Sequence, residues 1–171
     1  MIKLTRIFTL ALVLFTIVFS SCKKEAATDS KYYVKFKKNG TWITWSYALG
    51  ELGPDLIDDS KTNLGIVGYT ENGKGQINLS IQVDGPVLGT GVYNSDDYFI
   101  PIIYAENALE SDLYLMGDID GREESKYTIT ITSITDDSIS GHFTGNYLTK
   151  SFEENDVVEI TEGQFVAKRV R

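Results

Sequence analysis

The sequence predicts an all-β domain, an antiparallel β-sandwich or barrel-like fold of about eight to ten strands. From Tyr32 onward, apolar and polar residues alternate with a period of two, which is typical of strands that bury one face. The run from Ile77 to Val83 is the clearest example. No stretch of about a dozen residues keeps an apolar stripe at helical spacing. Turn-forming pairs such as Asn39-Gly40 and Asn72-Gly73 separate the alternating segments.

Ten segments in chain order have this strand pattern, with turn chemistry between them. We expect strands near residues 32–38, 41–48, 64–70, 76–83, 87–93, 99–105, 112–117, 125–134, 139–148 and 157–169. Their number and spacing suit one domain of antiparallel strands, and no internal repeat divides it.

The first hairpin has a register that can be worked out from its turn. A two-residue Asn39-Gly40 turn fixes which residues lie opposite one another. The predicted pairs are Phe36 with Ile43, Val34 with Trp45, and Tyr32 with Tyr47. All six fall on one face, as a single register requires if that face is buried. Trp42 falls on the opposite face, beside Lys35 and Lys37.

The hairpin around Asp136-Asp137 needs a loop of odd length. A two-residue turn there would set Ile131 opposite His142 and mix apolar with polar positions. We therefore expect three loop residues, which pair Ile131 with Gly141 or Phe143 and place an aspartate in the left-handed conformation.

The last strand changes parity along its length. Val158 and Ile160 share one face, whereas Phe165 and Ala167 have the opposite parity. A bulge at Glu162-Gly163 would bring all four side chains to the same side of the sheet.

Residues 1–21 have the form of a secretory signal peptide. Lys3 and Arg6 precede an apolar run over residues 7–19 and the small residues Ser20-Ser21. This run is shorter than the about 20 apolar residues of a membrane-spanning helix. The small residues and Cys22 resemble a bacterial lipobox, which implies cleavage before Cys22 and acylation of its thiol and amino group by fatty acids such as palmitate.

The resulting organisation is a signal peptide (1–21), a lipid-anchored tether (22–31) and a single all-β domain (32–171). Residues 23–30 are small and polar, with nothing to bury. By resemblance to enteric bacteria, the lack of an aspartate directly after Cys22 implies transport to the outer membrane. The periplasmic and surface sides both remain open.

The charge of the mature chain argues against nucleic acid as a partner. Without Lys3 and Arg6, 14 basic residues stand against 24 acidic ones, a net charge of −10. Such a surface repels phosphate backbones. Acylation of Cys22, the one cysteine, leaves the domain no disulfide, Cys-based zinc site or cysteine nucleophile.

Four motifs resemble a family of uncharacterised Bacteroidota lipoproteins, which is known as an all-β domain of unknown function. They are Asn39-Gly40-Thr41-Trp42, the segment Gly89-Thr90-Gly91-Val92-Tyr93, residues 139–145 (ISGHFTG) and residues 160–165 (ITEGQF). A structural role is sufficient to account for each motif. For example, Gly141 and Gly145 would leave room for large side chains of neighbouring strands. The resemblance therefore implies a fold and assigns no functional residue.

No set of residues predicts catalysis, a cofactor or a metal. His142, the one histidine, is expected to face solvent, because no nucleophile and orienting partner accompany it. Asp118, Asp120 and Glu123 offer a weak calcium site, but the EF-hand spacing fails and a turn between strands is favoured. Acidic residues are numerous enough for a carboxylate-dependent hydrolase, although nothing singles out a pair.

These observations favour a non-catalytic binding or structural module on a lipid anchor. Its partners would be the membrane, through the lipid, and a glycan, a small ligand or another envelope protein. Trp42 is the candidate ligand platform, because the register places it on the open face of the hairpin. The alternative is a barrel-like carrier of a small ligand, or a hydrolase, with a pocket inside the domain.

Overall fold

The structure is a computed structural model that describes residues 31–56, 58–107, 113–116, 125–150 and 153–170. Within these residues the chain forms twelve strands and no helix, which confirms the predicted all-β class. No helix of the described residues is long and apolar enough to cross a membrane. The predicted signal peptide, Cys22 and the tether up to residue 30 lie outside the described residues.

The strands follow the predicted order, with two of the predicted segments each divided into two. They are β1 (Tyr33–Lys38), β2 (Thr41–Trp45), β3 (Tyr47–Pro54), β4 (Lys61–Tyr69), β5 (Gln76–Asp84), β6 (Gly91–Asn94), β7 (Ile102–Ala105), β8 (Leu113–Leu115), β9 (Tyr127–Ile134), β10 (Ser138–Gly145), β11 (Tyr147–Lys150) and β12 (Glu153–Val170).

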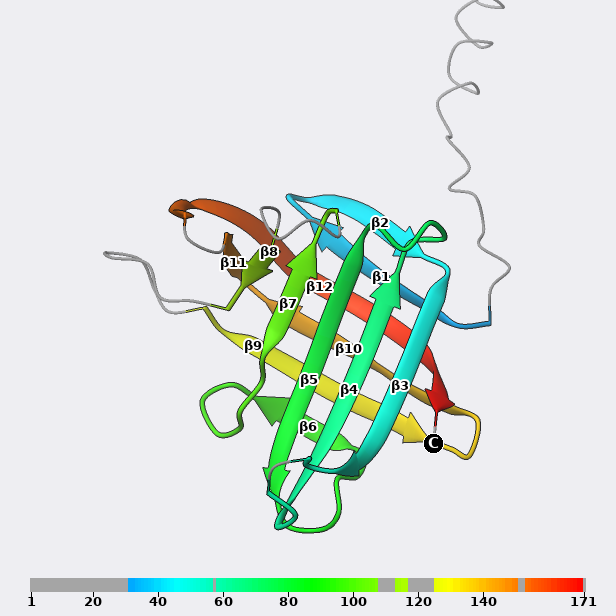
Figure 1. The fold of residues 1–171 in the computed structure, drawn as a ribbon. Helices are drawn as coiled ribbons and strands as arrows, with labels where there is room; N and C mark the ends of the chain where they lie inside the picture. The colour runs from blue at the N-terminus through cyan, green and yellow to red at the C-terminus, as the bar shows by residue number, and fades with distance from the viewer. Residues whose placement is uncertain (1–30, 57, 108–112, 117–124, 151–152, 171) are drawn as a thin grey trace, which may run out of the picture.

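One hydrogen-bonded sheet runs through the whole domain in the order β11-β8-β7-β5-β4-β3-β12-β10-β9-β6, with β1 joining β12 to β2. All of its pairs are antiparallel except β3 with β12, which is parallel. An additional pairing of β11 with β12 closes the path from β11 to β12 into a ring. Figure 1 shows β3, β4, β5 and β7 as a front layer, with β6, β9, β10 and β12 running across behind them.

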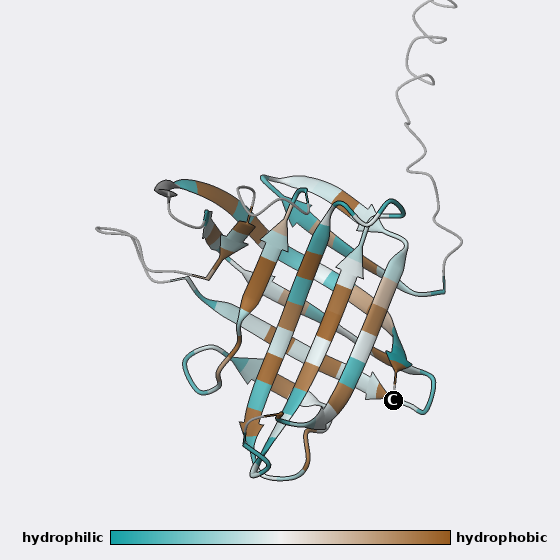
Figure 2. Cartoon of the chain, viewed as in Figure 1, coloured by the Kyte–Doolittle hydropathy of each residue, from teal (hydrophilic) through white to brown (hydrophobic). Residues whose placement is uncertain are grey.

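The core lies between the two layers and is built from every second residue. Along β4 and β5 the buried and partly exposed positions alternate strictly, and Figure 2 shows the matching alternation of hydropathy. The largest buried side chains include Phe36, Tyr127, Phe143 and Phe165, each at most 1% exposed. This period of two is the pattern that predicted the strands.

The first hairpin has the predicted register and turn. Val34 lies opposite Trp45 and Phe36 opposite Ile43. Asn39 and Gly40 have φ values of 48° and 75°, as a two-residue primed turn requires.

The expected burial of Tyr47 was wrong. The chain bends at Ser46, so the segment predicted as 41–48 ends at Trp45 and Tyr47 begins β3. Tyr47 faces outward and stacks on Tyr69, with ring centroids 5.4 Å apart. Because of the bend, Tyr47 does not continue the alternation of faces along β2. The pairing predicted from the Asn39-Gly40 turn therefore does not apply to Tyr47.

The expected three-residue loop at Asp136-Asp137 was also wrong. The two aspartates form a two-residue turn, across which the Thr135 N–H donates to the Ser138 carbonyl at 2.8 Å. Neither aspartate has a positive φ. The parity change occurs instead within β9, where the register shifts so that Gly141 still meets Ile131, as predicted. A bulge in β9 thus brings Ile131 opposite Gly141, a pairing that was expected from a three-residue loop.

The parity change in β12 is confirmed. Phe36 lies opposite Gly163 but Lys38 lies opposite Ile160, so β12 carries an extra residue at this point. Gly163 itself has no left-handed φ, contrary to the expectation of a bulge conformation there. Space explains this glycine, because a Cβ would overlap the Phe143 ring and lie 2.7 Å from the Lys35 carbonyl oxygen.

The predicted role of Gly141 and Gly145 is confirmed. A Cβ on Gly141 would overlap the Thr130 carbonyl and lie 2.8 Å from the Phe165 ring. A Cβ on Gly145 would overlap the Tyr127 ring. These two glycines therefore leave space that aromatic side chains of the core occupy.

Candidate functional site

Trp42 lies on the outer face of the first hairpin, as the register predicts, and is 37% exposed. The ammonium groups of Lys35 and Lys37 stand 4.9 and 5.3 Å from the centroid of its ring. Trp45, by contrast, is 8% exposed and stacks on Tyr104 in the core. Two cations thus contact the indole of Trp42, which leaves less of it for a ligand.

His142 faces outward on β10, between Thr130 of β9 and Gln164 of β12. Its position on a polar, exposed face agrees with the prediction of a solvent-facing residue. Among the described residues, no group of three or more His, Cys, Asp or Glu side chains could hold a metal ion. The candidate calcium ligands Asp118, Asp120 and Glu123 lie outside the described residues.

A groove that the sequence did not reveal lies on the outer face of β3, β4 and β5. It has a volume of about 360 Å³ and is open to solvent. We name it the glycine groove, because Gly53 and Gly65 contribute to it on adjacent strands. Its lining also includes Glu51, Pro54, Asp55, Leu56, Asn63, Leu64, Ser80, Ile81, Gln82, Phe99 and Pro101.

The two glycines of this groove have no structural explanation within the described residues. A Cβ added to Gly53 or Gly65 would meet nothing within 4 Å. Both have φ values outside the left-handed region, so neither supplies a turn. Glycine in a strand weakens the strand and often marks a place where another molecule or backbone comes close. Packing of the core therefore does not explain why these two positions are glycines, and the space above them is open at the surface.

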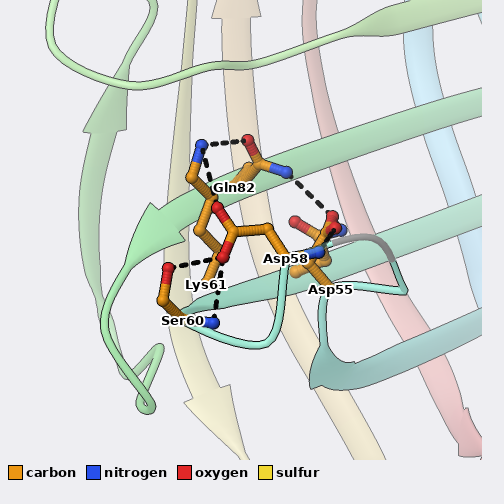
Figure 3. A network of polar contacts seen from close by, with 6 residues as sticks. Asp55, Asp58, Ser60, Lys61 and Gln82 are labelled. Carbon is orange, nitrogen blue, oxygen red and sulfur yellow. Dashed lines mark hydrogen bonds and ion pairs between the residues drawn. The ribbon is translucent and has the colours of Figure 1, made fainter.

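Asp55 organises the polar wall of the groove (Figure 3). Its Oδ2 accepts hydrogen bonds from the side-chain amides of Gln82, at 2.9 Å, and Asn63. Its Oδ1 accepts from the backbone N–H of Asp58 at 2.9 Å. These bonds tie the segment after β3 to the outer face of β4 and β5 and fix the planes of both amides.

Lys61 links Gln82 of this wall to Asp58. Its ammonium donates to Oε1 of Gln82 at 3.5 Å and lies 4.0 Å from a carboxylate oxygen of Asp58. The hydroxyl and the backbone N–H of Ser60 donate to the other oxygen of Asp58 at 2.5 and 3.1 Å. These two bonds lower the pKa of the Asp58 carboxyl, and the Lys61 charge adds to the effect.

Phe99 forms the opposite wall, and its side chain is 65% exposed. The segment that carries it pairs with β5, since the N–H of Gln82 donates to the Phe99 carbonyl at 3.0 Å. The N–H of Ser80 donates to the Pro101 carbonyl at 3.1 Å in the same way. Backbone bonds therefore hold an exposed aromatic ring beside the groove.

One polar atom at the groove has no partner. Oδ1 of Asn63 is buried and accepts no hydrogen bond in the described part of the chain. A buried acceptor left unsatisfied costs about 1–3 kcal/mol, so such atoms are rare. Because this atom is buried, it is not itself a contact for a molecule in the groove.

Neither family models, curated proteins nor solved structures gave a match to this chain. The groove therefore has to be interpreted from its own chemistry. Its described lining presents two carboxylates, two amides, a hydroxyl and an aromatic ring, without a histidine or a lysine. Such a set binds through hydrogen bonds and ring contacts.

One signal in the sequence could have revealed part of this site. Gly65 stands at an outward position of a strand whose inward positions are all explained by the core. The strand that carries Gly53 was not expected over its whole length, because residues 49–54 lack a simple alternation. The neighbours Phe99 and Gln82 come together through β-pairing between distant segments, which a pattern in one segment does not reveal.

Proposed function

We propose that this protein is a lipid-anchored, non-catalytic binding module of the cell envelope. Acylated Cys22 and the tether over residues 22–31 attach it to the outer membrane, and the glycine groove holds the ligand. The main support for this binding site is the pair of outward glycines, Gly53 and Gly65. Both have open space where a side chain would stand, and no contact within the described residues explains why they are glycines.

The glycine groove is a better ligand site than Trp42. Phe99 is 65% exposed and no lysine is among the described residues that line the groove, whereas Trp42 is 37% exposed beneath two lysine ammoniums. A ligand at Trp42 would have to displace those cations. At Phe99 it would meet a free ring edge or face and amides that Asp55 already orients.

The hydrogen bonds of Asp55 argue against a role as a general acid. Both of its oxygens accept hydrogen bonds from fixed donors, which favours the carboxylate form. A general acid needs the opposite environment, one that keeps the proton on the carboxyl. The core supports a surface site as well, because aromatic side chains occupy the space between the layers. A carboxylate-dependent hydrolase and an interior carrier stay as the alternatives.

The anchor can be tested separately from the groove. In the native organism, Cys22→Ala is expected to lose incorporation of a radioactive fatty acid and to release the protein from the membrane fraction. Wild-type protein and an exposed-site variant such as Gln164→Ala are the controls. Membrane-bound, labelled protein after Cys22→Ala would contradict the anchor.

The groove can be tested without knowing the ligand. The wild-type lipoprotein is extracted from its own envelope in mild detergent, and bound small molecules are identified by mass spectrometry. Gly65→Leu places a side chain in the groove, and Gln164→Leu is the control, because it places the same side chain at an exposed strand position outside the groove. We expect equal melting temperatures and a co-purified molecule that only Gly65→Leu loses. Retention of that molecule by Gly65→Leu would overturn the site.

A further inference from the structure

We infer that the ligand is an uncharged oligosaccharide that lies across Phe99, an inference that rests on the proposed binding function of the glycine groove. Three features of the described surface carry it. A second groove continues the first one past Phe99, hydrogen-bonding groups line both grooves, and carboxylates dominate their charge.

The second groove, which we name the lysine groove, has a volume of about 510 Å³. It shares Gln82 and Phe99 with the glycine groove, so the two form one path over β5. Its lining is completed by Lys61, Val83, Asp84, Val87, Tyr93, Asp97 and Tyr98. A path that passes an exposed ring and continues on both sides suits a chain-like ligand better than a single compact one.

The aromatic side chains are placed for contact with the apolar faces of sugar rings. Phe99 is 65% exposed and Tyr98, on the lysine-groove side, is 37% exposed. Tyr98 rests edge-on against Tyr93, with centroids 5.2 Å apart, and the Tyr93 hydroxyl donates to the Gly89 carbonyl at 2.8 Å. An aromatic ring fixed in this way presents a flat apolar surface at little entropic cost.

The polar groups along the path match hydroxyl groups. The Gln82 amide is held at both ends, by Asp55 and by Lys61, so its plane is set before a ligand arrives. Ser80 adds a hydroxyl to the lining of the glycine groove. A ligand hydroxyl both donates and accepts, and so it can satisfy amides, hydroxyls and carboxylates alike.

The charge along the path argues against anions. Glu51, Asp55, Asp84 and Asp97 line the two grooves, and Lys61 is the one cation among their described residues. Asp58 already lies 4.0 Å from the Lys61 ammonium. A phosphorylated or sulfated ligand would meet net repulsion there, whereas an uncharged sugar would not.

The experiment uses the full lipoprotein in detergent on an array of immobilised ligands. The array carries uncharged hexasaccharides of glucose, mannose, galactose and xylose, their sulfated forms, and a hexalysine peptide. Wild type, Phe99→Ala, Gly65→Leu and the control Gln164→Leu, which lies outside both grooves, are compared after their melting temperatures are shown to agree. Binding of at least one uncharged hexasaccharide is expected, with about a tenfold loss for Phe99→Ala, because a ring contact of this kind contributes about one power of ten.

The outcomes separate this inference from the proposed function. Loss of uncharged-sugar binding in Gly65→Leu and Phe99→Ala, but not in Gln164→Leu, supports both. Binding of hexalysine or of a sulfated sugar in place of uncharged sugars, still abolished by Gly65→Leu, overturns the oligosaccharide but keeps the groove. Binding of sugars that neither variant weakens overturns the groove itself. Absence of binding to every uncharged sugar, with native ligand still co-purifying, overturns the oligosaccharide alone.

Discussion

The two faces of β3 and β4 both carry glycines, and the glycines differ in what surrounds them. On the inner face, a Cβ at Gly68 would lie 2.5 Å from Cγ2 of Val34, and one at Gly50 would lie 3.0 Å from Cδ1 of Ile66. On the outer face, a Cβ at Gly53 or Gly65 would meet nothing within 4 Å. The inner pair is explained by close packing of the core. The outer pair needs a reason outside the described contacts, which is why it points to a ligand.

The largest expected effect separates the two faces directly. Gly68→Val should cost about 3 kcal/mol or more of unfolding free energy, since an isopropyl group would enter space that Val34 fills. Gly65→Val should change it by less than about 0.5 kcal/mol, or raise it, because valine favours strands and the space is open. Urea midpoints of the two variants measure the difference. Equal midpoints would mean that the outer face is as closely packed as the inner one.

The two tryptophans extend the contrast to the first hairpin. Trp45→Ala should cost about 3–5 kcal/mol, as expected for a buried aromatic residue that stacks on Tyr104. Trp42→Ala should cost about 1 kcal/mol or less, which corresponds to its contacts with two lysines. Chemical unfolding gives both values, and acrylamide quenching of single-tryptophan variants gives the accessibility. Similar losses and similar quenching would break the distinction between the faces.

A smaller effect is expected from a polar atom on the inner side. The Tyr127 hydroxyl is buried and has no partner in the described part of the chain, and burial raises the pKa of this tyrosine. Tyr127→Phe removes an unsatisfied group while keeping the ring that fills the space at Gly145. Stability should therefore rise by about 1 kcal/mol. Thermal unfolding of Tyr127→Phe against wild type measures it, and a loss of similar size would show that the hydroxyl has a partner after all.

The smallest effect concerns a carboxylate on the outer side. Because Ser60 donates two hydrogen bonds to Asp58, the folded state favours the ionised form and the pKa falls below its ordinary value. The stabilisation is therefore present above the ordinary pKa and is lost as the pH falls through the folded value. Ser60→Ala should move the pKa of Asp58 upward, and Ser60→Thr should leave it lowered. Carbon-detected NMR titration between about pH 2 and pH 6 follows this carboxyl. An unchanged pKa in Ser60→Ala would place its cause elsewhere.

Local features of the fold were predictable from the sequence. The Asn39-Gly40 turn set the register of the first hairpin and placed Trp42 outside, because turn geometry and side-chain parity depend only on adjacent residues. The parity change near Glu162 was predictable for the same reason. A bend such as the one at Ser46 interrupts the alternation of faces along a strand. For this reason the outward orientation of Tyr47 was not predicted.

The candidate site was less predictable, because its residues come from segments that are far apart. Gln82 meets Phe99 through a bridge between β5 and the segment before β7, and the segment after β3 brings Asp55 to the same place. None of these residues has a neighbour in the sequence that marks it as part of a groove. Gly65 alone carried a usable sign, a glycine at an outward position of an alternating strand.

The all-β class, the alternation of buried and exposed positions and the turn of the first hairpin can be predicted from local sequence, because each follows from the period of a strand or the φ of one or two residues. Three features depend on how distant segments pack: the closure of the sheet by β11 and β12, the register shift within β9, and the open groove beside Phe99. The physical reason is that strand pairing joins residues of any separation, so the identity of a strand's neighbour is set by the packing of the whole domain.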